Sequence, residues 1–273
     1  MSNQSITVLV IGATGSIGSL VVEEALRQGH SVRALVRSAE RARRLPANAE
    51  AVIGDLTRPD TLNVAVKGVD AIVFTHGSDG AGKVGSETVD YGGVRNVLAA
   101  LGSRRVRIAL MTAIGVTNRT GSYNRSTESH DWKRRAERLV RASGCPYTIV
   151  RPGWFDYNKA DEHQLVFLQG DLRQAGNSSD GVIARRQIAE VLVSSLTSDH
   201  ALRKTFELVA TKGPAQEDLD ALFAALDPDP EDGLDGVRDM RNQPPEDEPQ
   251  RVRDDLHALS GTLIRRSTQM EER

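Results

Sequence analysis

The sequence of 273 residues lacks features that several classes of protein require. It contains one cysteine, Cys145, which excludes an internal disulfide bond, and no Cys/His cluster has the spacing of a zinc site. No apolar run approaches the ~18–20 residues of a membrane helix, and residues 1–5 do not resemble the start of a secretory signal. We therefore expect a cytoplasmic protein with neither a metal site nor a membrane segment.

Charge is unevenly distributed, although the formal net charge is only −2. Residues 214–273 contain 16 Asp or Glu and 7 Lys or Arg, which gives −9, so residues 1–213 carry +7. Six of the ten prolines also fall in the last segment, where 227–232 and 243–249 predict loops or disorder. The composition indicates a domain over 1–213 and an acidic, Pro-rich C-terminal extension over 214–273.

Two interpretations of this extension remain open. A solvated tail is favoured, with short helices near 216–226 and 251–265. The alternative is that the acidic segment docks on the basic domain and covers a site, or binds a protein partner. The charge of +7 is modest and comes with no recognition helix, so we expect no nucleic-acid partner.

The front of the chain alternates between apolar, β-branched runs and segments with helical spacing. Strands are expected at 6–11, 31–37, 51–54, 71–74, 106–111 and 147–151, and helices at 16–28, 38–45, 60–67, 86–101 and 128–143. This alternation predicts an α/β fold, a Rossmann-like doubly wound parallel sheet with helices on both faces. Ligands of such folds bind at the carboxyl ends of the strands.

The motif Gly12-Ala-Thr-Gly-Ser-Ile-Gly18 lies between the first strand and the first helix. Gly12 permits a tight turn, Gly15 lets the backbone approach a pyrophosphate, and Gly18 lets the helix pack on the strand. Thr14, Ser16 and Ile17 complete this loop. The motif predicts a dinucleotide site, because a strand precedes it and a helix follows.

The second strand favours one dinucleotide over the other. An NAD site usually has Asp or Glu about 20 residues beyond the glycines. This strand instead ends in Arg37, 19 residues past Gly18, whose guanidinium can bind a 2′-phosphate. We expect NADP rather than NAD, and we assign the nearby Arg41, Arg43 and Arg44 to a solvated helix face.

The four segments Gly12–Gly18, Arg33–Arg37, Gly54–Leu56 and Tyr147–Gly153 together resemble the atypical short-chain dehydrogenases with an NmrA-like NAD(P)-binding domain. That group includes flavin- and biliverdin-reductase-like enzymes and members that only sense or carry the nucleotide. The resemblance covers about residues 6–210 and leaves the extension unexplained. It implies cofactor contacts from Asp55, Leu56, Thr75, His76, Gly77, Pro152 and Gly153.

The wider family commonly uses a Tyr-x-x-x-Lys pair for proton transfer, together with a Ser or Thr that holds the substrate oxygen. Lys133 matches the lysine and is expected at the nicotinamide ribose, but Ser129 stands where the tyrosine belongs. Thr112 matches the hydroxyl after the fifth strand. A serine hydroxyl is too weak an acid to replace a phenol. Tyr123, His130 and Tyr157 are candidates for a displaced acid.

Because Ser129 replaces the expected tyrosine, two functions remain open. The first is an NADP(H)-dependent oxidoreductase that transfers hydride to a small planar acceptor, such as a flavin or quinone, which takes its protons from water. Trp154, Phe155 and Tyr157 are expected to stack on such a ring. The second is a non-catalytic NADP(H) binder that acts as a redox sensor or as an assembly or regulatory protein.

Overall fold

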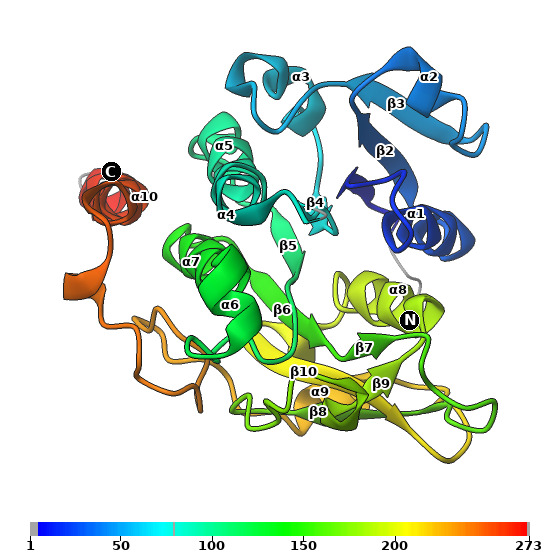
Figure 1. The fold of residues 1–273 in the computed structure, drawn as a ribbon. Coiled ribbons are helices and arrows are strands. Elements are labelled where there is room, and N and C mark those ends of the chain that lie inside the picture. The colour runs from blue at the N-terminus through cyan, green and yellow to red at the C-terminus, as the bar shows by residue number, and fades with distance from the viewer. Residues whose placement is uncertain (1–4, 79, 272–273) are drawn as a thin grey trace.

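A computed structural model describes residues 5–78 and 80–271, with side chains through residue 260 (Figure 1). The fold is a mostly parallel, Rossmann-like sheet with helices on both faces, as the sequence predicts. The seven parallel strands, in spatial order, are β3 (Ala49–Ile53), β2 (Ser31–Val36), β1 (Thr7–Ile11), β4 (Ala71–Phe74), β5 (Arg107–Met111), β6 (Tyr147–Pro152) and β10 (Lys204–Thr211). The strand order reverses between β1 and β4, which is where such folds bind nucleotides.

Three further strands extend the sheet beyond β10. They are β8 (Gln164–Leu168) and β9 (Val182–Ile183), which run antiparallel to β10, and β7 (Trp154–Phe155), which pairs with β9. These strands and β10 were not predicted from the sequence. β7 and β9 have only two residues each, too few for an apolar period to be recognised.

The helices in chain order are α1 (Gly18–Arg27), α2 (Ala39–Ala42), α3 (Asn63–Val66), α4 (Gly82–Gly85), α5 (Gly92–Leu101), α6 (Ser122–Thr127), α7 (Ser129–Ala142), α8 (Arg185–Ser194), α9 (Asp220–Ala224) and α10 (Gln250–Glu271). The single helix expected at 86–101 is a π-helical segment, Ser86–Tyr91, followed by α5. Gly29 ends α1 in the left-handed conformation, with φ of +85°, as its position predicts.

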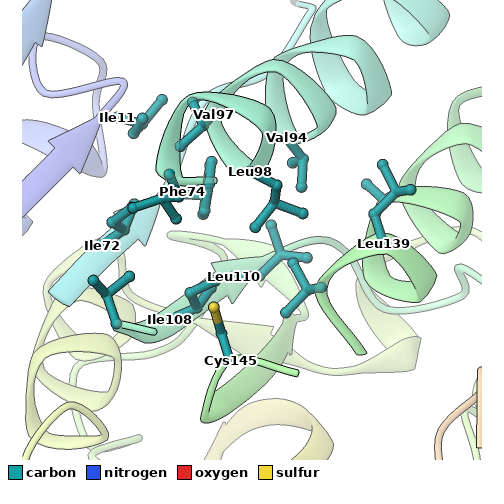
Figure 2. Packing of buried hydrophobic residues seen from close by; sticks show 14 of the residues in the cluster. Ile11, Ile72, Phe74, Val94, Val97, Leu98, Ile108, Leu110, Leu139 and Cys145 are labelled. Carbon is teal, nitrogen blue, oxygen red and sulfur yellow. The ribbon is translucent and has the colours of Figure 1, made fainter. Parts of the chain in front are cut away.

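The two faces of the sheet are covered by different helices. Apolar side chains of α3, α5, α7 and α10 pack with Leu9, Ile72 and Ile108 on one face, whereas α1, α8 and α9 pack on the other. Figure 2 shows the first of these cores, in which Phe74 and Leu110 of the sheet meet the helical Val97. Cys145 is also buried in this core. In the part of the chain described, no helix is long and apolar enough to cross a membrane.

The solvated-tail interpretation of the extension is wrong for several of its polar residues. Asp229, Gln243 and Glu248 are each at most 3% exposed. The segment after α9 runs irregularly beside α7 before α10 begins (Figure 1). The helix expected at 216–226 is reduced to the five residues of α9.

Five arginines explain why an acidic segment is buried here. Arg134, Arg135, Arg138 and Arg141 lie on α7 and Arg151 lies on β6, and all five are at most 8% exposed. No pattern in the sequence predicts that these arginines are buried. Buried guanidinium groups require carboxylate partners, however, and most of these partners come from the extension.

The ion pairs between α7, β6 and the extension are short. Asp235 bonds both Arg134 and Arg138 at 2.8–3.0 Å, and Glu248 bonds Arg135 and Arg138 at 2.6–2.7 Å. Two more carboxylates of the extension complete the cluster: Asp239 pairs with Arg151 at 2.6–2.7 Å, and Asp229 pairs with Arg141 at 3.2 Å. The extension therefore supplies four of the counter-charges that let this face of the sheet be buried.

Candidate functional site

The glycine-rich loop packs against the end of β4. A side chain at Gly12, whose φ is +87°, would place its Cβ 2.8 Å from the amide nitrogen of His76, and one at Gly18 would lie 2.1 Å from the Gly12 oxygen. Gly15 and Ser16 are exposed at the tip of the loop. Gly12 and Gly18 thus permit close packing, while the tip and the amino end of α1 remain accessible to an anion.

The other residues of the loop connect it to its surroundings. Ile17 is buried in the core and anchors the loop, whereas Thr14 is half-buried. The Nη1 atom of Arg41 lies 3.5 Å from the Thr14 hydroxyl, so the expectation that Arg41 belongs to a solvated face is wrong. Arg37 directly follows β2 and is exposed. Two arginines are therefore available beside the loop, at the end of β2.

Asp55 and Leu56 follow β3. The Oδ1 atom of Asp55 accepts hydrogen bonds from the amide and the hydroxyl of Thr57, each at 2.8 Å. The Thr57 amide in particular lowers the pKa of Asp55, so this group is a carboxylate at neutral pH. Leu56 packs on the core, and its carbonyl accepts a bond from Asn96 at 2.6 Å. Asp55 therefore caps its own loop, which leaves its predicted adenine contact a prediction.

After β4, Thr75 and His76 have different surroundings. The Thr75 hydroxyl donates to the Ile11 carbonyl at 2.9 Å and links the ends of β4 and β1. His76 Nε2 lies 3.1 Å from the Val89 oxygen, and burial lowers the pKa of the ring to about 4, so it is neutral at pH 7. Its Nδ1 atom is buried and, within the described structure, has no hydrogen-bond partner. Gly77, the next residue, is exposed.

Lys133 is held by an ion pair. Its ammonium lies 3.1 Å from Oδ1 of Asp90, and its side chain is 20% exposed. Asp90 comes from the π-helical segment and also accepts the Ser78 amide at 3.0 Å and the Ser78 hydroxyl at 2.9 Å. Lys133 is thus held beside the loop that follows β4, and its predicted contact with the nicotinamide ribose stays a prediction.

Ser129 and Thr112 are both buried, at 4% and 5% exposure. Ser129 is the first residue of α7. The Thr112 hydroxyl donates to Glu137 Oε1 at 2.7 Å, and Glu137 in turn accepts from Arg151 at 2.7–3.0 Å. The structure thus joins Thr112 to the buried arginine cluster. Its predicted contact with a substrate oxygen stays a prediction.

The three candidates for a displaced acid separate into two places. Tyr123 and His130 have ring centroids 5.3 Å apart, and His130 lies over Gly115 in the loop after β5. Tyr157 instead pairs with Trp154 at 6.3 Å, and both are solvent-accessible, at 66% and 37%. Burial lowers the pKa of His130, so at neutral pH it is an uncharged imidazole.

The end of β6 carries Pro152 and Gly153, both buried. The Pro152 carbonyl accepts from the Ile114 amide at 3.0 Å, which joins this turn to the loop after β5. A Cβ on Gly153 would lie 2.5 Å from the Gly181 oxygen, so the absence of a side chain there serves packing.

A cavity of about 330 Å³ lies beyond this turn. Ile114, Leu172, Glu207 and Arg238 are among its lining residues, so both the sheet and the extension contribute. Burial raises the pKa of Glu207 to about 7, although Arg151 opposes the shift. The cavity does not include the glycine-rich loop. Within residues 5–78 and 80–271, no group of His, Cys, Asp or Glu is arranged to hold a metal ion.

These residues fit a dinucleotide. The exposed loop tip and the amino end of α1 suit its pyrophosphate, and Arg37 and Arg41 suit an anion at the adenosine end. The unpartnered Nδ1 of His76, a residue that packs against Gly12, is an available acceptor. A family model described as NAD(P)H-binding matches residues 12–199. The chain belongs to this NAD(P)H-binding family.

Sequence relatives support the same placement. The chain is 28% identical over 268 residues to sanguinarine reductase of Eschscholzia californica, covering 82% of this chain and 97% of that protein. It is 32% identical over 222 residues to the uncharacterized sugar epimerase YhfK of Bacillus subtilis, with 79% and 99% covered. It is 26% identical to the photosystem II assembly factor Ycf39 of Synechocystis, covering 75% of this chain and 63% of that protein.

Solved structures show the same fold. A putative NAD-dependent epimerase/dehydratase from Bacillus halodurans matches with a TM-score of 0.68 at 23% identity, over 81% of this chain and all of that one. The anaerobilin reductase ChuY from Escherichia coli matches with a TM-score of 0.61 at 20% identity, over 77% and 100%. The expected atypical short-chain dehydrogenase-like family and a nicotinamide dinucleotide cofactor are therefore confirmed.

Three polar residues near the loop were not predicted as part of the site. Arg41 was assigned to solvent, and neither Asp90 nor Arg185 was considered. No sequence signal marks Asp90 or Arg185, because one depends on a π-helical segment and the other contacts Ser16 from 169 positions away.

Proposed function

We propose that this member of the NAD(P)H-binding family is an NADP(H)-dependent oxidoreductase whose hydride acceptor is a small planar molecule such as a flavin or quinone. The observation that carries the choice of NADP is the pair of arginines beside the glycine-rich loop. Arg37 is exposed at the position where NAD enzymes place an acid, and Arg41 reaches Thr14. Two guanidinium groups suit a 2′-phosphate better than a neutral ribose.

The bound nicotinamide would supply hydride chemistry, and this chain would orient it. Lys133 lies on α7 and is fixed by Asp90, and in this proposal it would donate to the ribose hydroxyls. His76 is neutral and can accept a hydrogen bond at Nδ1. Pro152 and Gly153 would form the wall at the nicotinamide.

The choice of a flavin or quinone as the acceptor rests on Ser129, which stands where the wider family has a tyrosine. A buried serine cannot act as the phenolic acid of a carbonyl reductase. A flavin or quinone needs no such acid, since water can supply its protons. The exposed Trp154 and Tyr157 offer an aromatic surface for a planar ring just beyond Gly153. The name of the relative sanguinarine reductase supports a reductase.

The test is the loss of NADPH absorbance with a panel of flavins and quinones, after binding has been confirmed by thermal shift. Arg37→Ala and Arg41→Ala should each raise the KM for NADPH about tenfold, the value of one charge-assisted hydrogen bond, and change that for NADH much less. Arg44→Ala is the matched control, because Arg44 is an exposed arginine of the same turn. Equal use of NADH and NADPH would contradict the choice of cofactor.

A second candidate function is a non-catalytic NADP(H) sensor or assembly factor, for which Ser129 and the relative Ycf39 are the motivation. It predicts that NADP and NADPH bind with clearly different affinities, or that one of them releases a protein partner. Tight binding without turnover on any acceptor of the panel would favour this function over the oxidoreductase.

A further inference from the structure

Arg185 links α8, which packs against α1, to the glycine-rich loop. It is the first residue of α8, and its Nε atom lies 3.2 Å from the hydroxyl of Ser16 at the exposed tip of the loop. Arg41 approaches the same loop at Thr14, from the adenosine side. The loop tip therefore lies between two arginines that come from opposite directions.

Two neighbours hold the Arg185 guanidinium in this place. It forms an ion pair with Asp156, whose Oδ1 also accepts the Arg185 amide at 3.0 Å. It also lies over the ring of Phe155, 5.3 Å from the centroid. The side chains of Arg185 and Asp156 are 35% and 48% exposed, so the pair is accessible to an incoming anion.

We propose that Arg185 binds the pyrophosphate on its nicotinamide side and exchanges Asp156 for this phosphate when the nucleotide binds. The inference rests on the proposed function, whose site it completes. Ser16 follows Gly15, the residue that lets the backbone approach the pyrophosphate, so a phosphate on the loop tip lies within reach of Arg185. The pyrophosphate as a whole carries two negative charges where Asp156 carries one, and it presents several oxygens to the planar fork of the guanidinium.

Arg185 is assigned to the phosphate of the nicotinamide half because of the residues that surround it. Asp156 and Phe155 belong to the segment after Gly153, which also carries the exposed Trp154. A move of Arg185 away from Asp156 therefore changes the surroundings of the segment proposed to meet the acceptor. Nucleotide binding and the acceptor side are coupled through this one side chain.

The experiment measures binding rather than turnover. Arg185→Ala, Arg185→Lys and the control Arg186→Ala are titrated with NADPH and with 2′,5′-ADP, which lacks the nicotinamide half and its phosphate. Arg186 is the neighbouring residue on α8, and its exposed guanidinium pairs with Glu23 at 2.7 Å instead of reaching the loop. Circular dichroism checks that each variant is folded.

We expect Arg185→Ala to weaken NADPH about tenfold or more, as the loss of a charge-assisted hydrogen bond predicts, and to leave 2′,5′-ADP unchanged. Arg185→Lys should recover part of the affinity, because it keeps the charge but not the fork. In a Trp132→Phe background, saturating NADP, which does not absorb where tryptophan emits, should change Trp154 fluorescence, and Arg185→Ala should reduce the change at saturation.

Equal NADPH affinity of Arg185→Ala and Arg186→Ala would overturn the inference while the proposed function stands. Equal weakening of NADPH and 2′,5′-ADP would overturn the assignment to the nicotinamide half. A wild-type protein that binds neither ligand would overturn the proposed function, and the inference with it.

Discussion

Thr112 shows how the surroundings of a residue change the meaning of a mutation. From its position after β5, a loss of activity on replacement would identify a substrate contact. In the structure its hydroxyl donates to Glu137, which also holds Arg151 inside the molecule. Replacing Thr112 therefore removes a hydrogen bond to a buried charge, worth about 1.5–3 kcal/mol, whether or not the protein is an enzyme. Activity data on this residue require a stability measurement beside them.

Six carboxyl groups lie beside the five buried arginines, so one carboxyl group is in excess, and Glu207 is that group. Glu137, Asp229, Asp235, Asp239 and Glu248 already balance the five guanidinium charges. Glu207 is 2% exposed and lies 3.4 Å from Arg151, and burial raises its pKa to about 7. In contrast, although burial opposes the shift, Arg151 lowers the pKa of Asp239 well below its usual value.

The raised pKa of Glu207 predicts a pH dependence of stability. Between the unfolded value of about 4.3 and about 7, the folded protein retains a proton that the unfolded chain has lost. Stability therefore falls as the pH rises through this interval and levels off above it. Between pH 5 and pH 8, the free energy of unfolding should fall about 2–3 kcal/mol further in the wild type than in Glu207→Gln. If urea denaturation showed that the free energy of unfolding of both proteins changes equally between pH 5 and pH 8, the raised pKa of Glu207 would be refuted.

At the scale of elements, α7 and the acidic extension complement each other. Arg134, Arg138 and Arg141 recur at intervals of four and three residues, so they form one stripe on the helix. The carboxylates that meet this stripe come from an irregular segment about 100 residues later. Hydrogen bonds and charge, rather than regular secondary structure, hold that segment in place.

The complementarity predicts which carboxylates of the extension matter. Glu248 is buried between Arg135 and Arg138, whereas Glu246, two residues earlier, is exposed. Glu248→Gln leaves the buried Arg135 without its counter-charge and leaves Arg138 with Asp235 alone, and it should lower the free energy of unfolding by about 3 kcal/mol. Glu246→Gln should change it by less than about 0.5 kcal/mol. Urea denaturation measures both, and equal effects would show that burial of the pair is unimportant.

The same elements show what the sequence could and could not reveal. Strands β1 and β4 and the loop from Gly12 to Gly18 were predictable, because a parallel sheet requires continuous apolar runs and a phosphate loop requires glycines. The path of the extension was not. Proline and excess charge predict a solvated segment only when the rest of the chain buries no charge of the opposite sign. Here the matching arginines are buried, and they lie far away in the sequence. The Lys133–Asp90 pair was hidden for a similar reason, since it depends on a π-helical turn.

At the scale of the whole molecule, these ion pairs join the extension to the sheet that carries the glycine-rich loop. The two tryptophans report on separate parts of this assembly. Trp132 is buried on α7, with Arg251 of α10 4.9 Å from the centre of its ring, and Trp154 lies on β7 near the proposed acceptor side. Trp154→Phe therefore leaves a probe of the extension, and Trp132→Phe leaves a probe of the nucleotide domain.

We expect the two single-tryptophan proteins to unfold in urea with the same midpoint and the same slope. The stability that each substitution costs is measured by a common probe, such as circular dichroism, and the fluorescence midpoints are corrected for it. The reason for the shared midpoint is that unfolding the extension alone would remove Val252 and Leu256 from the core shared with α7 and would break the ion pairs of Asp235, Glu248 and Asp239. Partial unfolding is then too unfavourable to be populated. A Trp132 transition that precedes both the Trp154 transition and the loss of helical signal would show instead that the extension folds and unfolds on its own.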